Sequence, residues 1–165
     1  MTKTNKILIK IIGVYQIIGG LFGLTLIFRQ SFSYIFWNFL YFVFIFGLFV
    51  FSIISGIYLL KAKLLLKGIK YSIVNQALQL IQFEIIGLGL YYVAGFYLAF
   101  GFSNTPQPHL IIDYSIFKSS CYLSFFRESN EITLSINVVA ITLLVYLIYL
   151  INPLRVNNKT IESNP

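Results

Sequence analysis

Long stretches without a charged residue constrain this chain more than any other feature. Ile11–Phe28 contains 18 such residues, Gln30–Leu60 contains 31 and Ile132–Leu154 contains 23. Another apolar stretch, from Tyr71 to about Gly95, is interrupted by a single acid, Glu84. About 20 consecutive apolar residues suffice for a helix to cross the hydrocarbon core of a bilayer. The sequence therefore predicts an integral membrane protein with four helical spans.

The composition agrees with a membrane protein and argues against several other classes. Apolar residue types make up 58% of the 165 residues and charged types only 10%, whereas average globular domains have roughly 45–50% and 25%. A disordered chain or an ordinary soluble enzyme would carry many more charged residues. The net charge of +7 does not indicate nucleic-acid binding, because the lysines cluster beside apolar runs rather than among aromatic residues. The expected partner is the lipid bilayer.

We expect a single membrane domain over residues 1–165, with spans at about 7–28, 35–60, 71–95 and 134–151. Asn152–Pro153 ends the last span, because proline lacks a backbone donor and disfavours a helical conformation in the residue before it. The predicted fold class is an all-α membrane protein. It is a four-transmembrane-helix bundle with a small extracytoplasmic β-like insert, at about 96–133, between the third and fourth helices.

The insert differs from the spans in the period of its apolar residues. These alternate with other residues in Phe96–Phe102, Leu110–Ile116 and Ile132–Ile136, and turn-forming residues lie between, at 103–106, 118–120 and 128–130. A period of two with turns about every ten residues favours short antiparallel strands. Open strands cannot face lipid, so a β-element is expected outside the hydrocarbon region. The alternative is an interfacial amphipathic helix, whose apolar stripe would be Leu110, Tyr114, Phe117, Cys121 and Phe125.

The distribution of basic residues predicts the orientation. Cytoplasmic flanks of membrane spans are enriched in Lys and Arg. Both termini and the connector at 61–70 are therefore expected in the cytoplasm, and the low-charge, Ile- and Phe-rich composition suggests a bacterial inner membrane. Nine basic residues lie on the predicted cytoplasmic side, Lys3, Lys6, Lys10, Lys61, Lys63, Lys67, Lys70, Arg155 and Lys159, and three on the other, Arg29, Lys118 and Arg127.

Glu84 is the candidate intramembrane ionisable site. An acid within a span costs roughly 2.5–3.5 kcal/mol or more near the bilayer centre. Glu84 would lie about 20 Å from Tyr71 along a helical third span, at or just past the midplane. Desolvation there favours a neutral carboxyl. We predict that Glu84 either couples transport to an ion or joins helices by hydrogen bonding.

Three amides form a candidate polar helix-contact stripe. Asn75, Gln79 and Gln82 are spaced by four and three residues, which places them on one helical face, with Glu84 roughly opposite. The stripe is expected to make interhelical hydrogen bonds, each contributing about 0.6–2 kcal/mol. A polar permeation path is the alternative.

Small residues mark candidate helix-packing positions. Residues four apart with small side chains let helix backbones approach closely. We expect packing within the bundle, with homodimerisation as the alternative. These positions are Gly13, Gly19, Gly20 and Gly23 in the first span and Ser52 and Gly56 in the second.

Neither a metal site nor a catalytic motif is evident. The chain has one cysteine, Cys121, and one histidine, His109, whereas a structural zinc site takes about four ligands. His109 lies near Asp113 in the sequence, which is weak evidence for a catalytic pair. No phosphate-binding loop or known hydrolase motif occurs. We therefore expect no cofactor and no enzymatic activity.

Two segments carry a resemblance to a group of proteins. Residues 64–71, Leu-Leu-Leu-Lys-Gly-Ile-Lys-Tyr, and 75–83, Asn-Gln-Ala-Leu-Gln-Leu-Ile-Gln-Phe, are the more distinctive parts. Together with the alternating insert and residues 136–140, they resemble small uncharacterised four-span bacterial membrane proteins. The resemblance covers about the second half of the chain. It implies a membrane fold and no particular activity.

Two functional hypotheses follow. The first is a non-enzymatic membrane component that binds itself or a partner protein through the insert or the aromatic second span. The second is a small oligomeric ion-coupled transporter or channel that uses Glu84.

Overall fold

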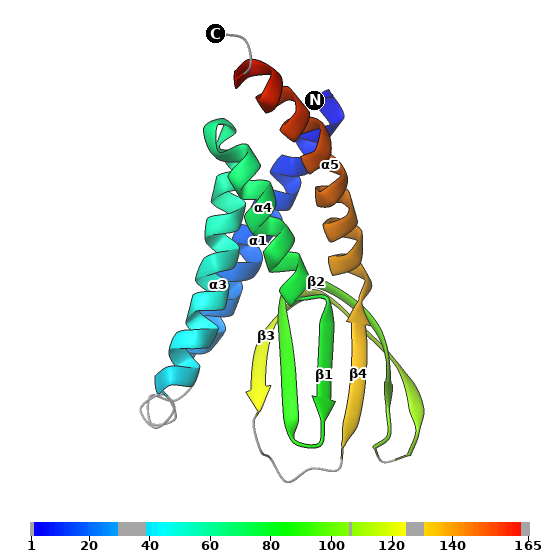
Figure 1. Cartoon of the computed structure of the whole chain (residues 1–165). Coiled ribbons are helices and arrows are strands. Elements are labelled where there is room, and N and C mark those ends of the chain that lie inside the picture. The colour runs from blue at the N-terminus through cyan, green and yellow to red at the C-terminus, as the bar shows by residue number, and fades with distance from the viewer. Residues whose placement is uncertain (1, 30–38, 106, 125–130, 163–165) are drawn as a thin grey trace.

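The computed structural model describes residues 2–29, 39–105, 107–124 and 131–162. An antiparallel sheet occupies one end of the molecule, and helices form the other end and also extend down beside the sheet (Figure 1). The elements in chain order are helix α1 (Lys3–Arg29), helix α3 (Phe39–Leu60), the short 3-10 helix η1 (Ala62–Leu64), helix α4 (Leu65–Leu78), strands β1 (Ile81–Ile85), β2 (Leu88–Ser103), β3 (His109–Ser124) and β4 (Ile132–Asn137), and helix α5 (Val138–Glu162).

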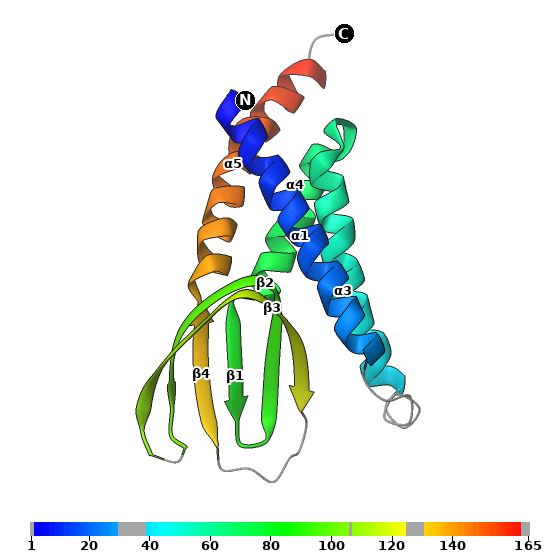
Figure 2. The same cartoon turned by 180° about the vertical axis from the view of Figure 1, so that it is seen from behind.

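Helices α1 and α3 coincide with the first two predicted spans. Both are long and apolar enough to cross a membrane. They lie side by side and antiparallel, as Figures 1 and 2 both show. Residues 35–38, the predicted start of the second span, lie outside the described residues. The two helices support the membrane character of the chain.

The predicted four-helix bundle is wrong, because the third and fourth spans are not continuous helices. Helix α4 has only 14 residues and is followed by β1. The fourth predicted span begins as strand β4 and becomes helical only at Val138. Its predicted end at Asn152–Pro153 is wrong as well, because helix α5 continues to Glu162. Apolar content is similar in a buried strand and a helix, so a count of apolar residues cannot separate them. In both spans, the alternating part is strand and only the remainder is helix.

The strands predicted in the insert are confirmed, and the interfacial amphipathic helix is wrong. The sheet is larger than predicted, since it begins at Ile81 and ends at Asn137. The turn expected at 118–120 lies within β3. At the junction with α5, the side-chain oxygen of Asn137 accepts hydrogen bonds from the backbone N–H groups of Val139 and Ala140. This N-cap explains why the helix begins there.

Strand β2 is bent into an arch (Figure 1). Its first residues pair with β1, its last residues pair with β4, and β1 and β4 pair with each other, all antiparallel. Strand β3 follows β2 along its other edge, with a shift of register between Gly95 and Tyr97. Gly95 has a φ of +123°, a conformation available to glycine and strained in other residues. The sheet therefore curls around an interior.

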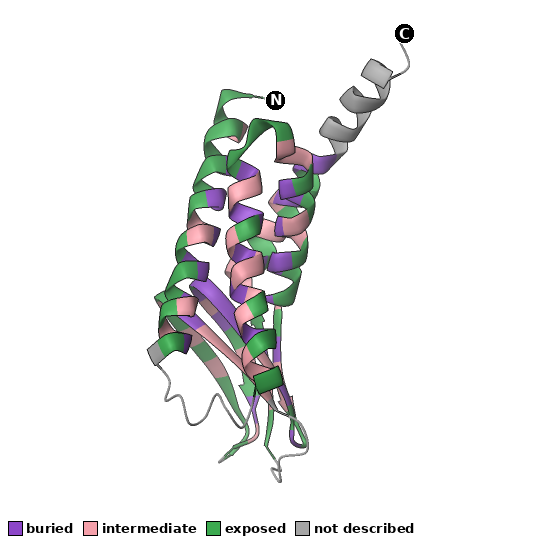
Figure 3. Ribbon diagram, turned by 90° about the vertical axis from the view of Figure 1, so that its left-hand side faces the viewer, coloured by how far each residue is buried: buried purple, intermediate pink, exposed green. Residues whose placement is uncertain are grey.

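The two faces of the curled sheet have opposite chemistry. The inward face carries buried polar side chains, including Gln82, Ser135 and Asn137. The outward face carries exposed apolar side chains, among them Phe100 and Ile112. Figure 3 shows exposed residues along the outer sides of the helices and lower strands. A sheet in water normally buries its apolar face, so this sheet is inverted.

Candidate functional site

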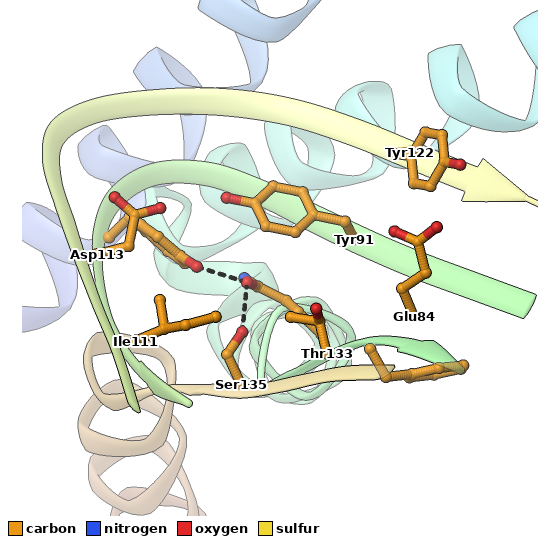
Figure 4. A pocket seen from close by; sticks show the side chains of 10 residues that line it. Glu84, Tyr91, Ile111, Asp113, Tyr122, Thr133 and Ser135 are labelled. Carbon is orange, nitrogen blue, oxygen red and sulfur yellow. Dashed lines mark hydrogen bonds between the residues drawn. The ribbon is translucent and has the colours of Figure 1, made fainter. Parts of the chain in front are cut away.

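A cavity of about 350 Å³ lies inside the curled sheet. We call it the polar cavity. Strands β2 and β3 arch over it, and side chains from all four strands point into it (Figure 4). It is lined by Gln82, Phe83, Glu84, Tyr91, Tyr97, Ile111, Asp113, Tyr122, Thr133 and Ser135.

Strand alternation explains why polar residues reach the cavity. Side chains two residues apart in a strand point to the same face. Gln82 and Glu84 in β1 and Thr133 and Ser135 in β4 all follow this spacing. Leu134, between Thr133 and Ser135, does not line the cavity and is 46% exposed on the outward face.

Gln82 is the centre of a buried hydrogen-bond network. Its Oε1 accepts from the Tyr97 hydroxyl at 2.6 Å and from the Ser135 hydroxyl at 3.2 Å. Its side chain is only 2% exposed, and its Nε2 has no hydrogen-bond partner among the described residues. A buried donor left in this state costs about 1–3 kcal/mol. The cavity wall therefore offers an N–H group to a ligand.

An ammonium group already lies against the wall of the cavity. Lys118 Nζ is 2.5 Å from a carboxylate oxygen of Asp113. It also lies 4.3 Å from the ring centroid of Tyr97 and 5.2 Å from that of Tyr91. Cations are attracted to aromatic ring faces within about 6 Å. Carboxylate and tyrosine rings thus combine here to hold a cation.

Glu84 does not lie in a helix, in contrast to the prediction. It is a half-buried residue of β1. The helical interpretation placed Glu84 opposite Gln82, whereas the strand places both on one face, where they line the same cavity. In Figure 4, Glu84 and Tyr122 lie toward one end of the cavity and Asp113 toward the other. The cavity therefore has a carboxyl group near each end.

The three amides of the predicted stripe are divided between helix and sheet. Asn75 in α4 donates from Nδ2 to the Ser52 hydroxyl of α3 at 3.2 Å, an interhelical bond of the expected kind. Gln79, just after α4, accepts from the backbone N–H of Ala94 at 3.0 Å. Gln82 belongs to the polar cavity. The stripe thus connects the interior of the helices with the interior of the sheet.

A second buried polar group lies among the helices. The Ser72 hydroxyl donates to Gln16 Oε1 at 2.9 Å, and the Ser52 hydroxyl donates to the Gln16 carbonyl at 3.1 Å. Gln76 is fully buried, and neither its Oε1 nor its Nε2 has a partner among the described residues. Buried polar side chains therefore extend from the interior of the helices to the polar cavity of the sheet.

The small residues lie at close contacts within one chain. A Cβ on Gly13 would lie 3.0 Å from the Gly56 carbonyl, and one on Gly20 would lie 2.7 Å from the Phe49 carbonyl. Ser52 bonds to α1, as described above. On Gly23, a Cβ would overlap the Phe49 ring. These positions therefore join α1 to α3.

Gly19 serves a different contact from the one expected. A Cβ there would lie 2.5 Å from the Ala94 carbonyl of β2. The Gly19 carbonyl accepts a hydrogen bond from the Ser119 hydroxyl of β3 at 3.0 Å. Gly19 therefore joins α1 to the sheet rather than to another helix.

Several cavity residues were not among the predicted site residues. Tyr91, Tyr97, Tyr122 and Asp113 all line the cavity, and none of them was a predicted site residue. The sequence feature that could have identified them is the alternation that predicted the strands, because the polar residues of an alternating strand share one face. His109 does not pair with Asp113: its Nδ1 lies 2.7 Å from the Gln107 carbonyl. Among the described residues, no cluster of three or more His, Cys, Asp or Glu side chains could hold a metal ion.

The chain matches no family model, and neither a curated protein nor a solved structure is similar to it. The functional argument therefore depends on the geometry of the polar cavity.

Proposed function

We propose that the protein is a non-enzymatic integral membrane protein that binds a small organic cation in the polar cavity. The observation that carries the proposal is the position of the Lys118 ammonium, between the Asp113 carboxylate and two tyrosine rings. A carboxyl group and a tyrosine ring also occur together at Glu84 and Tyr122, which line the other part of the cavity (Figure 4). Aromatic rings with a carboxylate are a recurring receptor for quaternary ammonium groups.

Choline and its uncharged isostere, 3,3-dimethyl-1-butanol (dimethylbutanol below), test this proposal. The purified protein in detergent is titrated with each compound, and its thermal stability is measured. We expect choline to stabilise the protein and dimethylbutanol to have little effect, because only choline is attracted by carboxylates and ring faces. Equal effects of the two compounds, or none from either, would contradict cation binding.

Carboxylate variants locate the site. Glu84→Gln should weaken the stabilisation by choline, because it removes a negative charge from the cavity wall. Glu131→Gln is the matched control, since Glu131 is exposed and does not line the cavity. A loss of binding in the control alone would place the cation elsewhere.

The proposed location is a bacterial inner membrane, with both termini in the cytoplasm. The lysines at 3–10 and 61–70 lie at the same end of the paired helices, away from the sheet (Figure 1), which supports this orientation. Cysteine labelling in a Cys121→Ala background tests it. A reagent that cannot cross membranes should label Thr105→Cys on intact cells, and Lys63→Cys only after permeabilisation. The reverse pattern would invert the orientation.

Ion-coupled transport through Glu84 is a second candidate. It is favoured by the buried polar side chains that continue from Gln16 in α1 to Gln82 in β1. Flux in proteoliposomes tests it. Transport should be lost in Glu84→Gln and kept in Glu131→Gln, and a transporter unaffected by Glu84→Gln would refute the coupling role.

Binding to a second copy or to another membrane protein stays a prediction. Native mass spectrometry of the protein, extracted from its own membrane in mild detergent, distinguishes these cases. A homo-oligomer without another chain would favour transport, whereas a different protein at a fixed ratio would favour an accessory role.

A further inference from the structure

We infer that the outward face of the sheet lies in the acyl chains of the leaflet opposite the lysine-rich end of the helices. This face is apolar and highly exposed in the single chain: Leu110 is 82% exposed, Tyr114 77%, Ile116 68% and Ile112 66%. Apolar residues continue over β4 at Leu134 and Ile136. Contiguous exposed apolar surface of this kind marks contact with a membrane or a partner.

The chemistry of the inward face excludes the usual arrangement of a sheet in water. Gln82, Ser135 and Asn137 point inward and are between 1% and 6% exposed. Polar residues inside and apolar residues outside, alternating along each strand, are the pattern of strands surrounded by lipid.

The depth of the sheet follows from its contacts with α1. The helix has 27 residues, a length of about 40 Å, which exceeds the hydrocarbon thickness of about 30 Å. Tyr15 and Gly19, near the middle of the helix, touch the bend of β2 at Phe96 and Ala94. If α1 crosses the bilayer, the bend lies near the midplane and the strands extend away from the lysines.

Strand geometry then places each residue at a depth. A leaflet contributes about 15 Å of hydrocarbon, which a strand crosses in roughly four or five residues. Phe100 lies four residues after Phe96 at the bend, and Ile112 pairs with Phe100. Leu134 lies four residues before helix α5 begins at Val138. All three therefore fall within this distance. Asn104, Thr105 and His109, at the far ends of β2 and β3, reach beyond it into water.

The pairing of the strands satisfies most of the backbone groups of the sheet. Unpaired backbone groups cannot face hydrocarbon. Strands β1 and β4 each have a paired neighbour on both sides, and β2 pairs with β3 along most of its length and with β1 or β4 at its two ends. Strand β3 is the edge strand in the described part of the chain. Its Ser119 hydroxyl donates to the Gly19 carbonyl, so α1 lies against part of this strand.

The adjoining helices identify the occupant as lipid rather than protein. At the level of the sheet, α1 and α3 expose apolar side chains such as Leu21, Leu40 and Val43. Helices of this composition expose such residues to acyl chains. The outward face of the sheet continues this surface into the same leaflet.

Nitroxide labels at single cysteines test the inference on the full chain in liposomes. Oxygen concentrates in hydrocarbon, and a water-soluble nickel chelate is excluded from it. We expect the oxygen-to-nickel accessibility ratio to be severalfold higher at Leu134→Cys and Ile112→Cys than at Thr133→Cys, the inward neighbour of Leu134. The background is Cys121→Ala, and circular dichroism confirms that each variant keeps its fold.

Two references make every outcome decisive. Val43→Cys reports a lipid-facing helix position, and Thr105→Cys reports water. Ratios at Leu134→Cys and Ile112→Cys that equal the Thr105→Cys value would place the sheet in water, and low access to both reagents would mean that protein covers it. Either result overturns the inference. Because the inference rests on α1 and its paired helix α3 crossing the bilayer, the Val43→Cys value in α3 separates its failure from the failure of the proposed membrane location.

Discussion

The helical half and the sheet half both enclose polar side chains, but they satisfy their backbones differently. In α1 and α3, every backbone bond within the helix is local, and the two helices need only small residues to approach each other. In the sheet, each strand depends on a partner distant in sequence: Ile81 of β1 pairs with Ile136 of β4. A substitution at the contact between α1 and α3 should therefore disturb only its neighbours. A substitution at the bend of β2 should weaken the pairing of several strands.

The largest expected effect is at the bend. Gly95→Val introduces a side chain at a φ of +123°, where a Cβ would also overlap the Tyr15 ring. Strain and overlap together should cost about 2–6 kcal/mol. Unfolding by dodecyl sulfate in mixed micelles, followed by circular dichroism, measures the loss. Gly47→Val is the control, since nothing lies within 4 Å of a Cβ there; similar losses in both variants would refute a special role for the bend.

The seam between α1 and α3 comes next. In Gly56→Leu, the new side chain would meet the Gly13 carbonyl and the Ile17 side chain, and overpacking of this kind costs about 1–3 kcal/mol. The same unfolding measurement should show a smaller loss than at Gly95, because two helices can separate slightly. Gly47→Leu, on the same helix, should be nearly neutral. A larger loss of stability in Gly56→Leu than in Gly95→Val would contradict the expectation that the sheet tolerates substitutions less well than the paired helices.

The interior of the sheet is tested by Gln82→Leu. The change leaves the hydroxyls of Tyr97 and Ser135 without their acceptor, at a cost of about 1–3 kcal/mol. Gln107→Leu, at an exposed position between β2 and β3, is the matched control. Equal stability of the two variants would show that the polar network does not hold the curl together.

The smallest expected effect is at the junction between the halves. Tyr92→Phe removes a hydroxyl that donates to the Leu48 carbonyl at 3.0 Å, and such a bond contributes about 0.5–1.5 kcal/mol. Tyr114→Phe changes a hydroxyl on a side chain that is 77% exposed and should be silent. A loss in the exposed variant that matched the buried one would indicate an effect on the unfolded state instead.

The predicted site was recovered in part, for a geometric reason. Gln82 and Glu84 were both identified from their polarity within an apolar stretch. Their relationship was wrong, because 100° per residue separates them on a helix whereas a strand places them on one face. The tyrosines and Asp113 were missed, since only the curl of β2 and β3 brings them to the same cavity.

The sequence by itself determined the features that depend on local order: the apolar helices α1 and α3, the small residues at their seam, the alternating strands and the cluster of lysines at one end. Only the tertiary structure decided where helix changes to strand within the last two apolar stretches and that the polar face of the sheet is the inner one. The physical reason is the range of the interactions. A helix closes its hydrogen bonds within four residues, whereas these strands find their partners up to 55 residues away, as Ile81 and Ile136 show, across segments that composition alone cannot align.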